Sequence, residues 1–325
     1  MRKVKLGRSE FEVSEIVFGA WAAGGWMWGS TDRRSAVDAI KAAYDAGVSS
    51  IDTAPIYGQG TSEEIVGEAI IDISRDKVEI LTKFGLRWDD TKGTLYFPSK
   101  NNEGKDIDIY KYAGKESIIY ECEQSLKRLG TDYIDLYQIH WPDVTTPIEE
   151  SFEAVERLIE QGKVRHAGVC NYDASQVQVV KNIIISNQIP YSMVNRGIEK
   201  EVLPYCFDEG IGVLAYSPLE RGLLTGKIKP GYTFAEGDHR ATHPHFAPDF
   251  VEKTQDLLQK IQTIADSHNA SLHQVILEWT LNQKGISAVL VGARNAEQSV
   301  ANAQRVHLSG DELSLIQEWA DAFAA

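Results

Sequence analysis

Short apolar runs rich in β-branched residues alternate with amphipathic helical patterns along nearly all of the 325 residues. The eight runs expected to form strands lie at 15–20, 49–53, 78–84, 133–140, 164–170, 189–195, 211–217 and 287–293. The helical pattern that follows each of them covers, in the same order, 32–46, 62–72, 115–129, 147–161, 173–186, 200–209, 271–282 and 295–304. Before the first run, the residues around Gly7 alternate in polarity and predict an N-terminal β-hairpin.

Eight strand-then-helix units predict a parallel sheet with helical crossovers, and eight of them in this length favour closure into a (β/α)8 TIM barrel. The first strand is not followed by the G-x-G-x-x-G pattern, which argues against an open dinucleotide-binding sheet. No linker or low-complexity stretch interrupts the chain. We therefore expect one domain over residues 1–325.

Two connections break the regular rhythm, at residues 84–114 after the third strand and 217–249 after the seventh. Loops of that length inside a compact domain are usually functional. The first mixes aromatic and charged residues, so it is expected either to fold over a site as a lid or to be a disordered surface insertion.

Charge and cysteine content exclude several classes of protein. The net charge is −14, and no basic stripe is visible, which argues against nucleic-acid binding. The three cysteines have neither disulfide-framework nor metal-ligand spacing, so reduced thiols in the cytoplasm are expected. No segment has the length and apolarity of a membrane span, and the N-terminus lacks a signal-peptide core, so neither membrane insertion nor secretion is expected.

Four polar residues stand at or just beyond the ends of three successive strands: Asp52, Tyr57, Lys83 and His140. In such barrels the chemistry sits at the carboxyl ends of the strands. Each residue alone has an ordinary explanation, because Asp52 can cap the next segment, Tyr57 can pack, Lys83 can extend its head into water, and His140 can be a buried core histidine. The convergence of all four favours a catalytic site.

The four residues fit one chemical task. A phenol has a pKa of about 10, and a neighbouring ammonium lowers it. Lys83 supplies that ammonium for Tyr57, Asp52 keeps Lys83 charged by ion pairing, and His140 offers a hydrogen bond to a substrate oxygen. The arrangement suits proton transfer to a carbonyl.

Three stretches, "IDTAPIYGQGTSEEIVGEAI", "LTKFG" and "ECEQSLKRLGTDYIDLYQIHWPD", closely resemble the aldo-keto reductase superfamily, and "RGLLTGK" resembles its bacterial-type, general-stress-protein-like branch. The resemblance extends from "VSEIVFGAW" to the last barrel helix. It implies that Asp52, Tyr57, Lys83 and His140 are the catalytic set. It also implies reversible reduction of aldehydes or ketones, with hydride from NADPH and a proton from Tyr57.

The resemblance assigns a cofactor site as well. Asn171 and Gln188 would bind the nicotinamide carboxamide, and Tyr216 would stack on the nicotinamide ring. The remaining cofactor positions implied by the resemblance are Trp21, Ser217, Leu219, Gly222 and Lys227, the last four around the pyrophosphate, and Gly292, Arg294, Gln298 and Asn302 around the adenosine phosphate. The planar fork of Arg294 would bind a 2′-phosphate, which favours NADPH over NADH. Two departures from the family pattern are Cys170, where many members carry serine, and "LVGAR", which lacks the commoner proline.

The substrate wall is expected to include Trp21, Trp28, Trp88 and Trp141, because aromatic side chains offer large rigid contact areas with a polar edge. Core packing is the alternative for each tryptophan. An aromatic wall with polar groups suits aldehydes, quinones or sugars equally, so the sequence leaves the carbonyl substrate open.

Three other functions compete with carbonyl reduction. Lys83 could form a Schiff base as in an aldolase, but the adjacent Asp52 opposes the lowered lysine pKa that this chemistry needs. The run "DHRATHPHF" offers His239, His243 and His245, yet no carboxylate stands in ligand-like spacing, so no metal site is expected. A cofactor-sensing regulatory subunit of a larger assembly is the third alternative, and the oligomeric state stays open.

Overall fold

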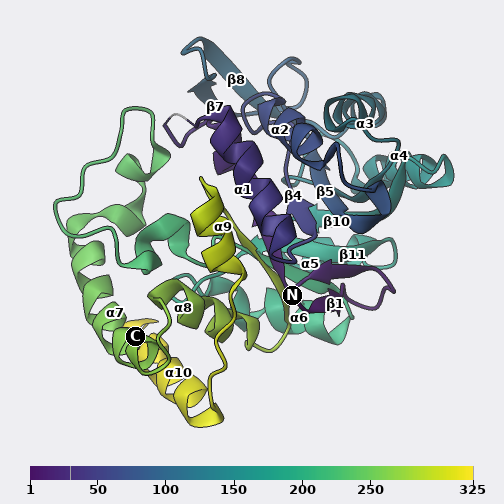
Figure 1. The fold of residues 1–325 in the computed structure, drawn as a ribbon. Coiled ribbons are helices and arrows are strands. Elements are labelled where there is room, and N and C mark those ends of the chain that lie inside the picture. Colours follow the sequence, from purple (N-terminus) through teal and green to yellow (C-terminus); the bar gives the residue numbers. More distant parts are fainter. Residues whose placement is uncertain (30, 325) are drawn as a thin grey trace.

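A closed barrel of eight parallel strands forms the centre of the computed structural model, which describes residues 1–29 and 31–324 (Figure 1). Around the barrel the strands follow the order β10-β11-β12-β13-β3-β4-β5-β9. Their bounds are β3 (Ile16–Gly19), β4 (Ser50–Asp52), β5 (Glu79–Phe84), β9 (Ile134–Ile139), β10 (Val164–Cys170), β11 (Ile184–Pro190), β12 (Gly212–Tyr216) and β13 (Ile286–Val291). The predicted (β/α)8 TIM barrel is confirmed.

A ring of helices covers the outside of the barrel (Figure 1). The helices that follow the eight strands are α1 (Arg33–Asp45), α2 (Thr61–Ile70), α3 (Lys115–Leu129), α4 (Ile148–Glu160), α5 (Ala174–Val180), α6 (Val202–Asp208), α8 (Leu272–Leu281) and α9 (Ala296–Ala303). Several begin at side-chain caps that satisfy their first free amides: Asp32 caps α1, and capping boxes open α5 and α8.

The segment 173–195 differs from the prediction. The expected helix over 173–186 ends at Val180, and the expected strand over 189–195 instead runs as β11 from Ile184 to Pro190. The physical reason is the run of three β-branched isoleucines at 183–185, which fits a buried strand better than a helical turn.

Two helices lie beyond the eight predicted ones. Helix α7 (Pro248–Ser267) starts where the second long connection ends, and α10 (Gly310–Ala324) closes the described chain. The two pack against each other on one side of the barrel (Figure 1).

The first long connection, residues 84–114, is folded, so the alternative of a disordered insertion is wrong. It forms an antiparallel sheet of β6 (Leu86–Arg87), β8 (Asp106–Lys111) and β7 (Thr94–Lys100), in that order. The indole nitrogen of Trp26 donates a hydrogen bond to the carbonyl of Lys100, and the amide of Asn102 donates one to Gly24. The small sheet is therefore tied to the loop that follows β3.

The two ends of the barrel differ in chemistry. At the amino end of the strands, the hairpin of β1 (Lys3–Lys5) and β2 (Glu12–Ser14) brings Leu6 and Val13 onto a buried cluster that also contains Val17, Leu81, Leu136, Leu214, Ala288 and Leu290. Apolar residues thus close this end, and polar residues gather at the other. Within the described ranges, no helix has both the length and the apolarity needed to cross a membrane.

Candidate active site

A buried ion pair lies at the carboxyl end of the barrel. The ammonium of Lys83 on β5 is 2.6 Å from Oδ1 of Asp52 on β4, and it also donates to the carbonyl oxygen of Thr53 at 2.9 Å. Lys83 is fully buried and Asp52 is 2% exposed. Because Asp52↔Leu81 is a pair in the parallel register, Lys83 lies two residues further along the neighbouring strand and points to the same interior.

Two glutamines complete the surroundings of this carboxylate. Gln188 on β11 donates from Nε2 to Oδ2 of Asp52 at 2.7 Å, and Gln138 on β9 lies 3.4 Å from the same oxygen. Gln138 was not among the residues predicted for the site. The signal was present, since Gln138 stands two residues before His140 and so faces the barrel interior with it.

Tyr57 and His140 lie together next to the ion pair. Their rings meet edge to face with centres 5.6 Å apart, and the Lys83 ammonium lies 5.1 Å from the centre of the Tyr57 ring. The backbone N–H of His140 donates to Phe84 at 2.9 Å, which fixes the histidine at the end of β9 beside β5. The structure therefore brings all four predicted catalytic residues together.

Burial governs the protonation of these groups. It raises the pKa of Tyr57 to about 12, and the opposing effect of the Lys83 charge is too small to bring the value below 10. The expectation that Lys83 gives Tyr57 a lowered pKa is therefore wrong for the protein alone. Burial and the Lys83 charge together hold the pKa of His140 well below its usual 6.5, so this imidazole is neutral and one ring nitrogen carries a hydrogen to donate.

Burial favours neutral Lys83, but the Asp52 carboxylate and Tyr57 outweigh it and raise the pKa of Lys83 above its ordinary value. The lysine is a permanent ammonium in this environment. A Schiff-base role needs the opposite shift, so the aldolase alternative loses its chemical basis.

Asn171 and Tyr216 form the next layer of the site. The Asn171 amide donates to the carbonyl of His140 at 3.0 Å, and its side-chain oxygen accepts from the Tyr216 hydroxyl at 2.9 Å. Asn171 has φ +62°, a left-handed conformation that asparagine adopts more readily than most residues with a side chain. This conformation and the two hydrogen bonds fix the amide between His140 and Tyr216.

These residues line a cavity of about 1000 Å³ at the carboxyl end of the barrel. Of the predicted site residues, the cavity wall includes Trp21, Trp28, Asp52, Tyr57, His140, Trp141, Asn171, Gln188, Tyr216, Ser217, Leu219, Gly222, Lys227, Gly292, Arg294, Gln298 and Asn302. Lys83 lies behind the wall, buried against Asp52. Trp88 is the exception: it lines a separate small cavity with Arg87 and Tyr120, so its role at the substrate stays a prediction.

The cavity wall combines aromatic rings with positive charge. Trp21 stacks on Tyr57 with ring centres 5.8 Å apart, and Tyr96 and Phe97 of β7 also line the wall. The cationic side chains of the wall are Arg221, Lys227, Arg240 and Arg294, and the guanidinium groups of Arg240 and Arg294 lie over the ring of Trp28. In a chain of net charge −14, this concentration of cations marks a place for an anionic group.

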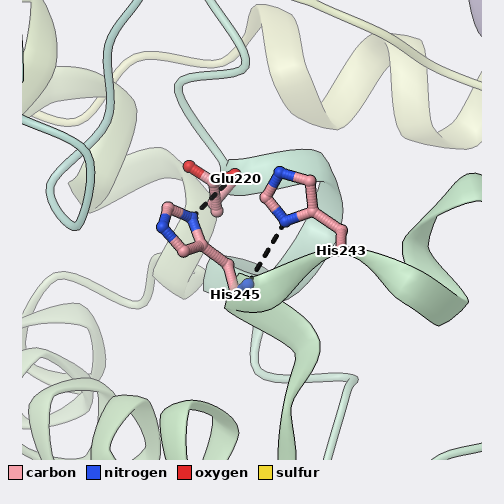
Figure 2. Close-up of side chains that lie close together, drawn as sticks. All are labelled: Glu220, His243 and His245. Atoms are coloured by element: carbon pink, nitrogen blue, oxygen red, sulfur yellow. Dashed lines mark hydrogen bonds and ion pairs between the residues drawn. The ribbon is translucent and has the colours of Figure 1, made fainter.

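The three loop histidines do not form one cluster. His239 stacks on Trp21, with ring centres 4.9 Å apart, and its Nδ1 lies 2.6 Å from the carbonyl oxygen of Met27. His243 and His245 instead lie with Glu220, with one candidate ligand atom from each residue within 4.8 Å of the others (Figure 2). The loop sequence around the histidines offers no suitable carboxylate, but Glu220, about twenty residues earlier in the chain, supplies one. The guanidinium of Arg221 already contacts both Glu220 and His243, so the absence of a metal site stays our prediction.

Comparison with known proteins gives a consistent result. A model of the Aldo/keto reductase family matches residues 15–321. The aldo-keto reductase YhdN of Bacillus subtilis is 40% identical over 302 residues, 92% of this chain and 86% of the relative. An Escherichia coli protein named NADH-specific methylglyoxal reductase is 38% identical over 333 residues, 99% of both chains. The structure of the glycerol dehydrogenase AKR11B4 from Gluconobacter oxydans superimposes with a TM-score of 0.86 at 34% identity, covering 99% of this chain and 95% of the other.

Proposed function

Because the chain belongs to the aldo/keto reductase family, we propose that it is a nicotinamide-dependent reductase that reversibly converts aldehydes or ketones to alcohols, with Tyr57 as proton donor and NADPH as preferred cofactor. The observation that carries the proposal is the joint placement of Tyr57, Lys83, Asp52 and His140 at a cavity whose wall also carries several cationic side chains.

The cavity fits an extended dinucleotide. Its volume of about 1000 Å³ is at the upper end of small-molecule sites. Lys227 and Arg294 make no ion pair with a carboxylate among the described residues, so both are available to phosphate oxygens. Beside His140 and Asp52, Asn171 and Gln188 offer amides for a carboxamide, and Tyr216 offers an aromatic face.

The bound cofactor supplies a hydride to the carbonyl carbon. Tyr57 donates its phenolic proton to the carbonyl oxygen, so that an alcohol leaves and a phenolate stays in the site. Lys83, permanently charged beside Asp52, stabilises that phenolate. Neutral His140 donates a hydrogen bond to the same oxygen and orients the carbonyl.

The preference for NADPH rests on Arg294. Its guanidinium lines the cavity at the start of α9, held there by a hydrogen bond of 3.0 Å from Nη2 to the carbonyl oxygen of Trp28. A planar guanidinium matches a phosphate monoester, which NADPH has and NADH lacks. The similar E. coli protein that is named NADH-specific makes this preference the part of the proposal to measure first.

We expect the substrate to lie beside Trp21, Trp28 and Trp141, where Tyr96 of β7 packs on Trp141 with ring centres 5.4 Å apart. This lining suits compact carbonyl compounds with polar substituents, since the indole nitrogens of Trp21 and Trp28 are buried and have no hydrogen-bond partner within residues 1–29 and 31–324.

Oxidation of NADPH with a panel of aldehydes and ketones tests the function, with wild type and Tyr57→Phe measured in parallel. Removing the proton donor should lower turnover by roughly 10²- to 10⁴-fold. Binding of NADPH, followed by its fluorescence, should persist in the variant. Turnover that survives in Tyr57→Phe would refute the proton donor, whereas cofactor binding without turnover of any carbonyl in wild type would favour a cofactor-sensing subunit.

A further inference from the structure

Stacked aromatic rings link Tyr57 to the second long connection, residues 217–249. The indole of Trp21 stacks on Tyr57 with ring centres 5.8 Å apart and 24° between the planes. His239, which begins a 3-10 turn in that connection, stacks on the same indole with centres 4.9 Å apart and 28° between the planes. In the part of the chain that the structure describes, Trp21 and Tyr57 line the cavity and His239 does not. His239 therefore contacts the site from behind its wall.

His239 also meets the edge of a second tryptophan of the wall. Its ring centre lies 4.9 Å from that of Trp28, with 81° between the planes, and Trp28 meets Trp21 edge to face at 5.3 Å. Of these three rings, the one that stacks on Tyr57 is Trp21. The path from His239 to the phenol thus passes through Trp21.

Two hydrogen bonds fix the imidazole of His239. Its backbone N–H donates to the carbonyl oxygen of Met27 at 3.1 Å, and its Nδ1 lies 2.6 Å from the same oxygen. A carbonyl oxygen only accepts, so Nδ1 carries the ring hydrogen, and burial lowers the pKa of His239, which keeps the ring neutral. Met27 itself has φ +65°, a left-handed conformation that its contacts have to hold. The ring of His239 is therefore held in one orientation and one tautomer.

The turn that carries His239 is fastened on its other side as well. Asp238 is 6% exposed and accepts two hydrogen bonds from the Arg240 guanidinium, at 2.9 and 2.6 Å, and one from the Arg240 backbone. Nη1 of Arg240 donates to the carbonyl of Arg221 at 3.1 Å. Arg221 and the preceding Glu220 are consecutive left-handed residues, with φ +51° and +43°. The turn thus joins the loop after β12 to the loop after β3.

Proton transfer from Tyr57 depends on where its ring lies. The phenol is bounded by Trp21, by the edge of His140 and by the Lys83 ammonium. A reacting group displaced by about 1 Å can cost roughly 10²-fold in rate, even when the substituted residue is far from the chemistry. Removing the His239 ring takes away one of the two rings stacked on Trp21, so Trp21 would bound Tyr57 less tightly.

We propose that His239 is a positioning residue for proton transfer: through Trp21 it fixes the phenol of Tyr57, so the second long connection has to lie on the loop after β3 for turnover at the full rate. This inference rests on the proposed function and adds to it a residue outside the cavity wall. A purely structural role predicts a different result. Loosening the connection would weaken cofactor binding, because the same connection carries Arg221 and Lys227 of the cavity wall.

The test compares the rate of the chemical step with the affinity for NADPH. Protein loaded with NADPH is mixed with excess 4-nitrobenzaldehyde, and the decay of NADPH absorbance gives the single-turnover rate. His239→Ala should lower that rate roughly tenfold and leave the Kd for NADPH, measured by its fluorescence, unchanged. His268→Ala is the matched control and should change neither value, because His268 is also half-buried and hydrogen-bonded, to Glu312, but lies outside the cavity wall.

Two conservative variants separate the ring from the hydrogen bond. His239→Phe keeps a ring that can stack on Trp21 but loses the hydrogen on Nδ1. His239→Asn keeps a side-chain N–H for the Met27 carbonyl but loses the ring. Phenylalanine should recover more of the single-turnover rate than asparagine does. Full recovery with asparagine and none with phenylalanine would show that the hydrogen bond matters and the stack does not, which overturns the proposal.

A double-variant cycle tests the path through Trp21. In the Trp21→Ala background, His239→Ala should lower the single-turnover rate no further. The same loss in both backgrounds, an unchanged rate in His239→Ala, or a loss of NADPH affinity that matches the loss of rate would overturn the proposal. If wild type reduces neither 4-nitrobenzaldehyde nor any other carbonyl of the panel, the result counts instead against the proposed function.

Discussion

Gln188 and Asp52 are joined by a hydrogen bond of 2.7 Å across the barrel interior, although 136 residues separate them in the chain. Gln188 is 3% exposed, and its side-chain nitrogen is committed to the carboxylate. The role toward a nicotinamide that we propose for Gln188 is therefore combined with a structural one: its hydrogen bond stabilises the carboxylate that holds Lys83.

Removing only one charge of the Lys83–Asp52 pair should lower the stability of the protein. Asp52→Asn leaves the buried ammonium of Lys83 without its counter-charge, so the free energy of unfolding should fall by about 3–5 kcal/mol. Asp52→Asn combined with Lys83→Met removes both charges and should be more stable than the sum of the single effects implies. Urea unfolding followed by tryptophan fluorescence measures this. Strictly additive losses would show that the two residues do not interact as described.

The pH dependence of the two reaction directions should differ. Reduction needs protonated Tyr57, and because the pKa of Tyr57 is about 12, that form persists as pH rises through neutrality. Neutral His140 likewise persists as pH falls, since its pKa lies well below 6.5. Log kcat/KM for reduction should be level between roughly pH 7 and 10, while alcohol oxidation, which needs the phenolate, should rise over the same range. Parallel profiles in the two directions would contradict the assignment.

Glu121 on α3 should make stability depend on pH. Its carboxyl accepts from the backbone of Gly85 and from Ser117, but burial raises its pKa from 4.5 to about 7. The folded state then binds more protons than the unfolded state between these values, so the contribution of Glu121 to stability falls as pH rises through this window. Thermal melts of wild type and Glu121→Gln at about pH 5 and 8 test it, because glutamine cannot ionise. The variant should gain stability relative to wild type at the higher pH, by roughly 3 kcal/mol at most. An equal difference at both pH values would exclude titration of Glu121.

Cofactor choice should depend on Arg294. Arg294→Ala should raise the KM for NADPH by roughly ten- to a hundredfold, the size of a lost charge-assisted contact, and change that for NADH little. Steady-state kinetics with both cofactors gives the ratio directly. If both KM values rise together, Arg294 does not read the 2′-phosphate.

The regular part of the fold could be predicted because each strand and helix carries its own period. The eight β/α units and the four candidate catalytic residues follow from that pattern, from the rule that strand ends hold the chemistry, and from the family resemblance. Helix α7 was missed although its signal was present: Thr254, Leu257, Leu258 and Ile261 follow a helical spacing and are buried.

Contacts between distant segments could not be predicted in the same way. Glu220 joins His243 and His245 only because two left-handed residues turn the loop after β12, and no local pattern announces such a conformation for residues other than glycine. The pKa of Tyr57 is a similar case. The sequence reveals its neighbour Lys83, but the larger effect is burial, which depends on how the whole site packs.

The closed order of the strands has a consequence for how activity arises during folding. The side chains around the ion pair come from four strands, β4, β5, β9 and β11, which carry Asp52, Lys83, Gln138 and Gln188. The barrel closes only when its last strand, β13, pairs with its first strand, β3. A chain that has formed only its first half has the lysine and the tyrosine but neither the amide of Gln188 nor the wall carrying Arg294. Recovery of catalysis after denaturation therefore reports closure of the barrel. During refolding it should lag behind the return of the circular-dichroism signal of the helices.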